Sequence, residues 1–272
     1  MRPFRPGLCS VTCRALPLEQ VVDLAASAGV EAIEWGGDVH VPHGDLAAAE
    51  LAVVRSAAAG LEVVSYGSYL FLDGDVERHL GAVLDTAAVL RAPGVRVWCP
   101  FGIEPGAPSS ERAAVVRAAA TAAAAAEERG LHLTLEFHGG TLTADAASTR
   151  SLLDEVGSAA LLSAWQPPYW APRAAEEEAA DIGLLTPALA HVHVYDWSPD
   201  LTRHPLRDDD ERWVARLAAA AGAGSGATDV GAPRSALVEF VPGDEPDAVA
   251  GQVAVLRGWL DRLDDGSGRL SR

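Results

Sequence analysis

The sequence predicts an α/β protein, a single (β/α)8 TIM barrel. Eight short apolar runs rich in β-branched residues alternate with eight longer, alanine-rich stretches along the 272 residues. This alternation is typical of strand–helix units around a parallel barrel. No glycine-rich dinucleotide-binding motif follows the first run, which disfavours a doubly wound sheet. We therefore expect one barrel domain over residues 1–263 and a disordered tail over residues 264–272.

The predicted strands are short runs bounded by turn residues. In chain order they span 7–12, 32–35, 62–66, 95–99, 132–137, 161–165, 191–195 and 236–241. The predicted helices are the stretches between and after them, at 17–28, 45–59, 75–90, 109–129, 144–156, 174–185, 208–221 and 246–263. Asp45 and Ser109 suit the first turn of a helix, and Gly29 and Gly60 stand where a left-handed residue can end one.

Composition excludes several classes of function. The formal net charge is −17, and this disfavours a nucleic-acid partner, because phosphate binding depends on neutralisation by Lys and Arg. All 21 basic residues are arginine, and the chain has no lysine. Such a chain cannot form a lysine Schiff base, anchor pyridoxal phosphate on a lysine, or use the lysine of a phosphate-binding loop.

We expect a cytoplasmic protein with no membrane partner. The N-terminal residues contain no apolar signal core, and the longest apolar stretch, 118–126, is too short to span a bilayer. The cysteines, Cys9, Cys13 and Cys99, are an odd number without zinc-type spacing. We therefore assign them neither a disulfide framework nor a thiolate metal site.

Three predicted strands end in side chains that bind metals or protons. The segments are Leu-Glu-Phe-His at 135–138, His-Val-His at 191–193 and Val-Glu-Phe at 238–240. Because the carboxyl ends of barrel strands meet at one rim, the side chains of Glu136, His193 and Glu239 are expected to converge there. Carboxylates so placed need a cation partner or a metal. His193 is preferred over His191 because it lies closer to the strand end.

Other residues at predicted strand ends are candidate substrate contacts. They are Glu34, His40, Tyr66, Trp98, His138 and Trp165. Aromatic rings at a barrel rim either pack the loops or form a wall against the apolar face of a sugar. A loop imidazole such as His40 is a weak indication, and an ordinary structural role is an equal alternative.

These strand ends resemble those of the xylose isomerase-like TIM barrel superfamily of sugar phosphate isomerases and epimerases. The resemblance rests on the segment 32–40, Ala-Ile-Glu-Trp-Gly-Gly-Asp-Val-His, together with the three strand-end segments named above. It implies a divalent metal, Mn²⁺, Mg²⁺ or Co²⁺ foremost and Zn²⁺ also, held by Glu136, His193 and Glu239. The fourth ligand of the family is an aspartate after strand six, and this chain has Gln166 there. Gln166 offers an oxygen without charge, so a metal-free site is the alternative.

The resemblance also implies an activity. Glu136 and Glu239 correspond to the pair of carboxylates that move a proton beside a carbonyl in a small sugar, polyol or keto-sugar, through an enediolate. A dehydratase of a keto-inositol type and a catalytically silent sugar-binding barrel are the alternatives. The lysine-dependent xylose isomerases and the three-zinc endonucleases are disfavoured, because their ligands and lysine are missing. Homo-oligomers are common in the family, although no interface is evident.

Overall fold

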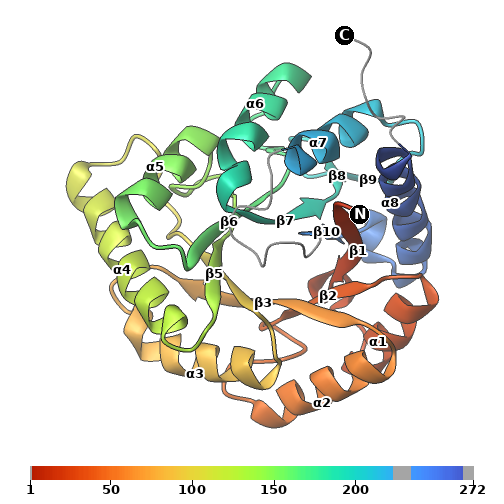
Figure 1. Ribbon diagram of the computed structural model, residues 1–272, viewed down its shortest axis with the longest axis horizontal. Helices are drawn as coiled ribbons and strands as arrows, with labels where there is room; N and C mark the ends of the chain where they lie inside the picture. The colour runs from red at the N-terminus through yellow and green to blue at the C-terminus, as the bar shows by residue number, and fades with distance from the viewer. Residues whose placement is uncertain (1, 223–233, 266–272) are drawn as a thin grey trace.

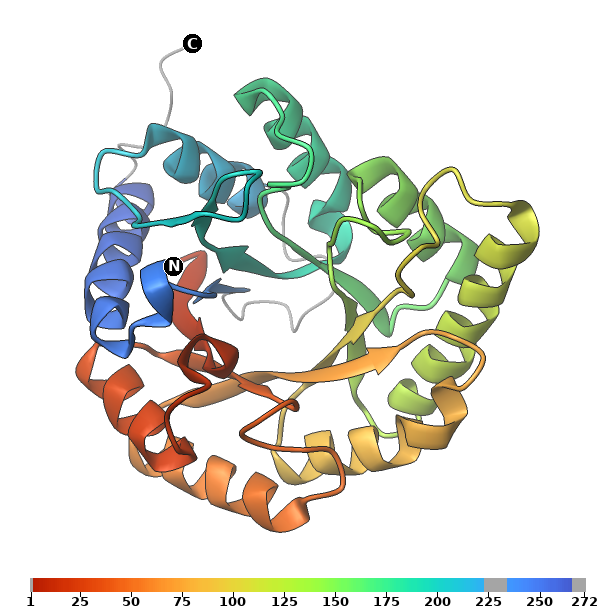
Figure 2. The same ribbon diagram turned by 180° about the vertical axis from the view of Figure 1, so that it is seen from behind.

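The chain folds into a closed parallel barrel inside a ring of helices, as predicted. The computed structural model describes residues 2–222 and 234–265. Eight strands close in the order β1-β10-β7-β6-β5-β4-β3-β2, all pairs parallel. The helices surround the barrel on every side (Figures 1 and 2). The tail expected at 264–272 lies almost wholly outside the described residues.

The barrel strands occupy the predicted places with shifted ends. They are β1 (Phe4–Cys9), β2 (Ala32–Gly36), β3 (Glu62–Phe71), β4 (Gly94–Trp98), β5 (His132–Leu135), β6 (Leu161–Trp165), β7 (Leu189–Val194) and β10 (Arg234–Val238). The helices are α1 (Leu18–Ser27), α2 (Leu46–Ala58), α3 (Val76–Val89), α4 (Ser109–Glu127), α5 (Ala146–Val156), α6 (Ala175–Leu185), α7 (Glu211–Ala221) and α8 (Val249–Asp264). Short 3-10 turns lie at Ser10–Cys13, Thr186–Ala188, Pro242–Asp244 and Pro246–Ala248.

Local chemistry accounts for these ends. The Asp45 side chain accepts the Ala48 N–H and starts α2, while Asp210 caps α7 and delays its start from the predicted 208 to Glu211. Gly29 and Gly60 follow α1 and α2 with φ of +77° and +74°, the left-handed conformation that glycine adopts without strain.

The early ends of two strands, β5 and β10, matter for the site. β5 stops at Leu135 and β10 at Val238, so Glu136 and Glu239 are the first residues beyond their strands. Their backbones stay tied to the barrel, because the Glu136 N–H donates to the Val97 carbonyl at 2.9 Å and the Glu239 N–H donates to Val194 at 3.1 Å. The two carboxylates therefore follow the last residues of their strands, at the rim of the barrel, on backbone that hydrogen bonds hold in place.

The third strand is longer than predicted and irregular. β3 continues to Phe71, and its register with β4 shifts between Gly67 and Leu70. Within the shift, Tyr69 takes a φ of 56°, a strained conformation for an aromatic residue.

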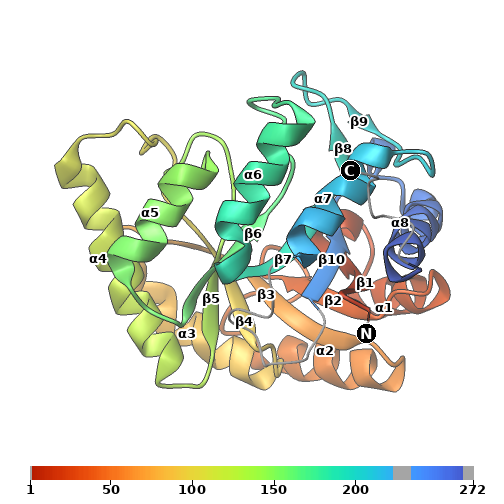
Figure 3. The ribbon, with the colours of Figure 1, turned by 45° about the horizontal axis from the view of Figure 1, so that its top comes forward.

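A small hairpin rises above the barrel. β8 (Asp196–Trp197) and β9 (Arg203–His204) pair antiparallel after β7, and Figure 3 shows them on the side of the barrel away from the N-terminus. That side is the rim formed by the carboxyl ends of the strands, where barrel enzymes carry their active sites.

Within the described residues, no helix is long and apolar enough to cross a membrane. Cys9, Cys13 and Cys99 are buried free thiols, which agrees with the prediction that they form no disulfide.

Candidate active site

The predicted trio of Glu136, His193 and Glu239 converges at the rim. His193 Nδ1 lies 3.2 Å from a Glu239 oxygen and 3.7 Å from a Glu136 oxygen, and one donor atom of each residue lies within 4.8 Å of the others. Gln166 joins them, because its Oε1 is 3.1 Å from the same His193 nitrogen. All four side chains are buried. The strand order explains the convergence, since β7 lies between β6 and β10.

An arginine that sequence reasoning missed completes the cluster. Arg96, in the middle of β4, is 1% exposed. Its Nη1 donates to Glu136 Oε2 at 2.9 Å, and its Nε donates to Glu34 Oε1 at 2.9 Å. The available signal was an arginine inside the apolar run Val95–Trp98, because a buried guanidinium requires carboxylate partners.

A cavity of about 190 Å³ opens above these residues. Its polar lining comprises Arg14, Arg96, Glu136, His138, Gln166 and Glu239, and its aromatic lining comprises Tyr69, Trp98, Tyr169, Tyr195, Trp197 and Phe240. Carboxylates at one side of a small cavity and rings around it suit a ligand with hydroxyl groups and an apolar face. Two of the candidate substrate contacts, Trp98 and His138, are in this lining.

Three other candidate contacts lie elsewhere, and we do not place them in the site. His40 is buried, with Nδ1 3.0 Å from Ser10 Oγ and Nε2 3.1 Å from the Leu16 carbonyl oxygen. The Tyr66 hydroxyl donates to the Val41 carbonyl at 2.8 Å. Both side chains thus hold the loop after β2 in place. Trp165 packs against Trp213 of α7, with ring centroids 6.4 Å apart, in the layer between barrel and helices.

Glu34 is buried against Arg96 and is not part of the cavity lining. Burial alone would raise its pKa, but the charges of Arg96 and His193 lower it to about 2. His191 Nε2 lies 3.9 Å from Glu34, and burial lowers the His191 pKa to about 3, so this imidazole is neutral. His193, rather than His191, faces the rim carboxylates.

The carboxylates around His193 change its ionisation. Burial opposes a charged imidazole, yet Glu239 and Glu136 raise the pKa of His193 to about 9. The pKa of Glu239 is lowered. Burial alone would raise it, but the charge of the nearby His193 has the larger effect. An imidazolium therefore lies between the two carboxylates of the metal-free protein, and a metal ion has to displace its proton.

These residues fit a divalent metal. Two carboxylates, one imidazole nitrogen and one amide oxygen form the mixed N/O donor set that suits Mn²⁺ or Co²⁺, and Mg²⁺ through its oxygens. Glu136 and Glu239 supply the negative charges of this donor set. Gln166 adds an oxygen to the set without adding charge.

His138 lines the cavity, and a hydrogen bond to the backbone fixes the orientation of its ring. Its Nδ1 lies 2.7 Å from the Gly139 carbonyl and donates to it, which leaves Nε2 as the acceptor in the neutral ring. The Tyr169 hydroxyl is 3.5 Å from that nitrogen. The ring also packs on Trp98, with centroids 4.9 Å apart.

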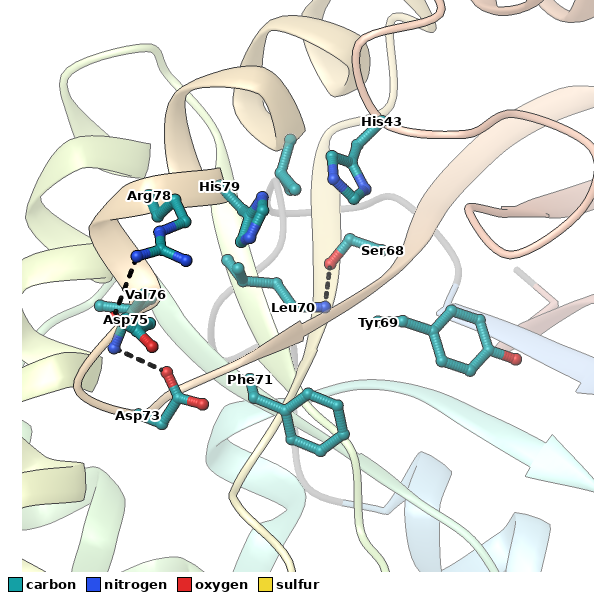
Figure 4. Close-up of a pocket in the computed structure, with 11 residues that line it drawn as sticks. His43, Ser68, Tyr69, Leu70, Phe71, Asp73, Asp75, Val76, Arg78 and His79 are labelled. Atoms are coloured by element: carbon teal, nitrogen blue, oxygen red, sulfur yellow. Dashed lines mark hydrogen bonds and ion pairs between the residues drawn. The ribbon is translucent and has the colours of Figure 1, made fainter.

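A second cavity, of about 370 Å³, lies between the end of β3 and the start of α3. Figure 4 shows His43, His79, Arg78 and Phe71 around it. Its carboxylates are used locally, because Asp73 accepts the Asp75 N–H at 2.9 Å and Arg78 lies 4.0 Å from the Asp75 carboxylate. Lacking a free pair of acidic groups, it is the weaker candidate for an active site.

A closed barrel of eight parallel strands inside a ring of helices places the chain in the class of (β/α)8 barrel proteins. The sequence profile of the xylose isomerase-like TIM barrel family matches residues 22–239. The chain belongs to this family, as the strand-end segments predicted.

Solved structures of similar fold share little sequence with the chain. An L-ribulose 3-epimerase is 18% identical with a TM-score of 0.71, over 99% of this chain and 98% of that one. A D-allulose 3-epimerase from Methylomonas sp. is 15% identical with a TM-score of 0.71, over 96% and 99%.

The probable 3-DHS dehydratase AsbF from Bacillus anthracis is 18% identical with a TM-score of 0.70, over 93% of this chain and 99% of that chain. At such identities the likeness establishes the fold alone. A comparison with curated protein sequences finds no match.

Proposed function

We propose that the protein is a metal-assisted isomerase or epimerase of a small sugar, polyol or keto-sugar. The observation that carries the proposal is the convergence of Glu136, His193 and Glu239, two of which, Glu136 and Glu239, line one small cavity with aromatic walls. Membership of a family whose structural neighbours include two ketose 3-epimerases supports it.

The residues suit a proton transfer next to a carbonyl. Glu136, Gln166, His193 and Glu239 would hold the metal, which as a Lewis acid stabilises negative charge on the substrate oxygens. One of the carboxylates Glu136 and Glu239 removes the proton from the carbinol carbon. In an isomerisation the proton is returned to the adjacent carbon, and in an epimerisation the other carboxylate delivers a proton to the opposite face. The rings of Trp98 and Trp197 pack against the carbon skeleton and exclude water, which strengthens each electrostatic contact.

A dehydratase is the second candidate. It begins with the same proton abstraction and then expels a neighbouring hydroxyl group as water. The observation that favours it is His138, which lines the cavity and whose Nε2 can accept a proton and then pass it to a leaving hydroxyl. The structural likeness to a probable 3-DHS dehydratase adds weight.

Metal content and proton exchange test the proposal. We expect the purified protein to bind about one Mn²⁺ per chain by calorimetry, and Glu239→Gln to lose most of that binding. With Mn²⁺ and a panel of keto-sugars in D₂O, NMR should show deuterium entering beside the carbonyl. Glu245→Gln, at an exposed glutamate in the loop after the same strand, is the matched control and should behave as wild type.

The other outcomes are informative. Exchange that persists in EDTA would show a metal-free enzyme. Neither binding nor exchange with any compound would favour a catalytically silent barrel, and the proposal would fail.

Gln166→Glu should raise the affinity for Mn²⁺ about tenfold or more. The substitution keeps the length of the side chain and adds the negative charge that the position lacks, and a tenfold gain in affinity corresponds to only about 1.4 kcal/mol of added attraction. Calorimetry on the wild type, Gln166→Glu and the neutral Gln166→Met measures the change. Equal affinity in the wild type and Gln166→Glu would mean that Gln166 does not contact the ion.

A further inference from the structure

Arg14, in the segment between β1 and α1, lies at the mouth of the active-site cavity. It belongs to the cavity lining, and its side chain is 44% exposed. Its Nε donates to Asp38 Oδ2 at 2.7 Å, and its Nη2 donates to the Tyr69 hydroxyl oxygen at 2.9 Å. In the part of the chain that the structure describes, no hydrogen bond uses its third nitrogen, Nη1. A guanidinium has five N–H groups, so Arg14 keeps donors for a ligand.

The position of the Arg14 guanidinium is fixed before any ligand binds. Besides the contact with Asp38, its central carbon lies 5.5 Å from the ring centroid of Phe240, which is also part of the cavity lining. A planar guanidinium that is hydrogen-bonded on one edge and stacked on a ring loses less freedom when a ligand binds than a side chain that moves in solvent. The cavity mouth therefore holds a positive charge in one place.

Tyr69 supplies a second donor beside Arg14. Its hydroxyl oxygen accepts a hydrogen bond from Arg14, so the hydroxyl hydrogen is available to a ligand. Burial raises the pKa of Tyr69 to about 12, so the hydroxyl keeps this hydrogen at neutral pH. Figure 4 shows the Tyr69 ring pointing away from the second cavity, and the residue also lines the active-site cavity.

The backbone around Tyr69 is held in the conformation that directs its ring to the site. The Ser68 hydroxyl donates to the Arg96 carbonyl at 2.7 Å and accepts the Leu70 N–H at 3.2 Å. These bonds fix the register shift of β3 in which Tyr69 takes its φ of 56°. Backbone strain of this kind is found where it positions a group for a ligand. The central carbon of Arg96 lies 5.7 Å from the Tyr69 ring centroid, so Tyr69 links the cavity mouth to the carboxylate cluster.

The chemistry of this pair of donors suits an anion. Carboxylate and phosphate oxygens only accept hydrogen bonds, and those from a guanidinium to such oxygens are roughly twice as strong as bonds between neutral groups. A neutral sugar hydroxyl would gain much less from the charge of Arg14. A ligand whose anionic end lies at Arg14 and Tyr69 extends its hydroxyl and carbonyl groups into the cavity that Glu136 and Glu239 line.

We propose that Arg14 and Tyr69 form a subsite for an anionic group, a phosphate or a carboxylate, at the end of the substrate that does not react. This inference rests on the proposed function and deepens it, because it names the substrate as an acidic or phosphorylated keto-sugar. Arg14 and Tyr69 bind and orient this substrate, and the proton transfer stays with the paired carboxylates.

Three five-carbon compounds that do not react test the subsite without turnover. Ribitol is neutral, ribonate carries a carboxylate, and ribitol 5-phosphate carries a phosphate. Ligand-observed NMR titrations in EDTA at pH 7 and constant ionic strength exclude binding through a metal. We expect one of the two anions to bind the wild type at least about tenfold more tightly than ribitol. The anion that does so shows whether the subsite takes a phosphate or a carboxylate.

Two substitutions assign the preference to the proposed donors. Arg14→Met should remove the preference for the anion and leave the affinity for ribitol within about twofold. Tyr69→Phe, which deletes only the hydroxyl, should weaken anion binding by about threefold or more. Equal affinity of the wild type for all three compounds would overturn the proposal, and so would an anion preference that persists in Arg14→Met.

Arg173 provides the matched control. It lies 2.8 Å from Asp181, and the two side chains are 36% and 18% exposed, against 44% and 22% for Arg14 and Asp38. Arg173 is not in the cavity lining. Arg173→Met should therefore keep the wild-type preference, and a loss equal to that in Arg14→Met would overturn the proposal, because net charge alone would then account for anion binding.

The test separates this inference from the proposed function. Anion preference that depends on Arg14, without deuterium exchange in any keto-sugar or its phosphate, would support the subsite and count against the isomerase or epimerase. Deuterium exchange in neutral keto-sugars without any preference for anions would support the enzyme and overturn the subsite.

Discussion

Arg96→Leu should lower the free energy of unfolding by about 3–5 kcal/mol. The substitution leaves Glu34 and Glu136, which are 1% and 2% exposed, without the guanidinium that both contact. Breaking a buried ion pair by removing one partner has about this cost, because the remaining charge stays in a medium of low polarity. Urea unfolding at pH 7 in EDTA, followed by circular dichroism and tryptophan fluorescence, measures the change.

A surface pair provides the control for this prediction. Arg112 contacts Glu155 at 2.7 Å, but their side chains are 18% and 40% exposed. Arg112→Leu should therefore cost no more than about 1 kcal/mol, since water solvates the glutamate that remains. If Arg96→Leu cost as little as Arg112→Leu, the buried carboxylates would be adapting by taking up protons, and Arg96 would not be essential to the barrel.

Much of the site could be predicted from the sequence, because the residue types at the ends of the predicted strands indicate which side chains lie at the rim. A carboxylate or imidazole that closes an apolar run in a (β/α)8 pattern has only one rim to occupy, and Glu136, His193 and Glu239 do meet there. The fold was predictable for the same reason, since eight alternating units allow few arrangements.

Arg96 could not be placed in the same way. An arginine within a strand can face the helices, the barrel interior or the solvent at the strand end, and only the barrel register decides among these. Its role depends on Glu34 and Glu136, which lie 62 and 40 residues away in the chain. Such partners become visible only when β2, β4 and β5 are brought into one sheet.

The predictions for His40 and Trp165 were wrong because the path of a loop and the face of a strand cannot be read from the sequence. His40 follows β2 closely enough to suggest the rim, but the loop folds back so that Ser10 and Leu16 take both of its nitrogens. Trp165 ends a strand, yet its ring faces α7 rather than the cavity. Side-chain direction alternates along a strand, so an error of one residue in register moves a tryptophan from a cavity to the outer layer.

Stability should fall steeply in acid, and Glu34 should account for a large share of the fall. Its folded pKa of about 2 lies below the ordinary value of 4.5, so the unfolded chain binds the proton more readily. The contribution is therefore fully present above pH 4.5 and is lost as the pH falls to about 2. A difference of this size amounts to about 3 kcal/mol.

His191 acts in the same direction over a higher range. Its folded pKa of about 3, against an ordinary 6.5, means that the unfolded chain takes up a proton from pH 6.5 downward while the buried imidazole stays neutral. Urea unfolding in EDTA at steps from pH 7 to 3 should show stability declining from about pH 6.5, with the slope steepening below 4.5. Glu34→Gln, which has no proton to take up, should flatten the lower part of the profile and leave the upper part. A variant profile parallel to that of the wild type throughout would mean that Glu34 is not held ionised by Arg96, and that the charge balance inferred for the barrel interior is wrong.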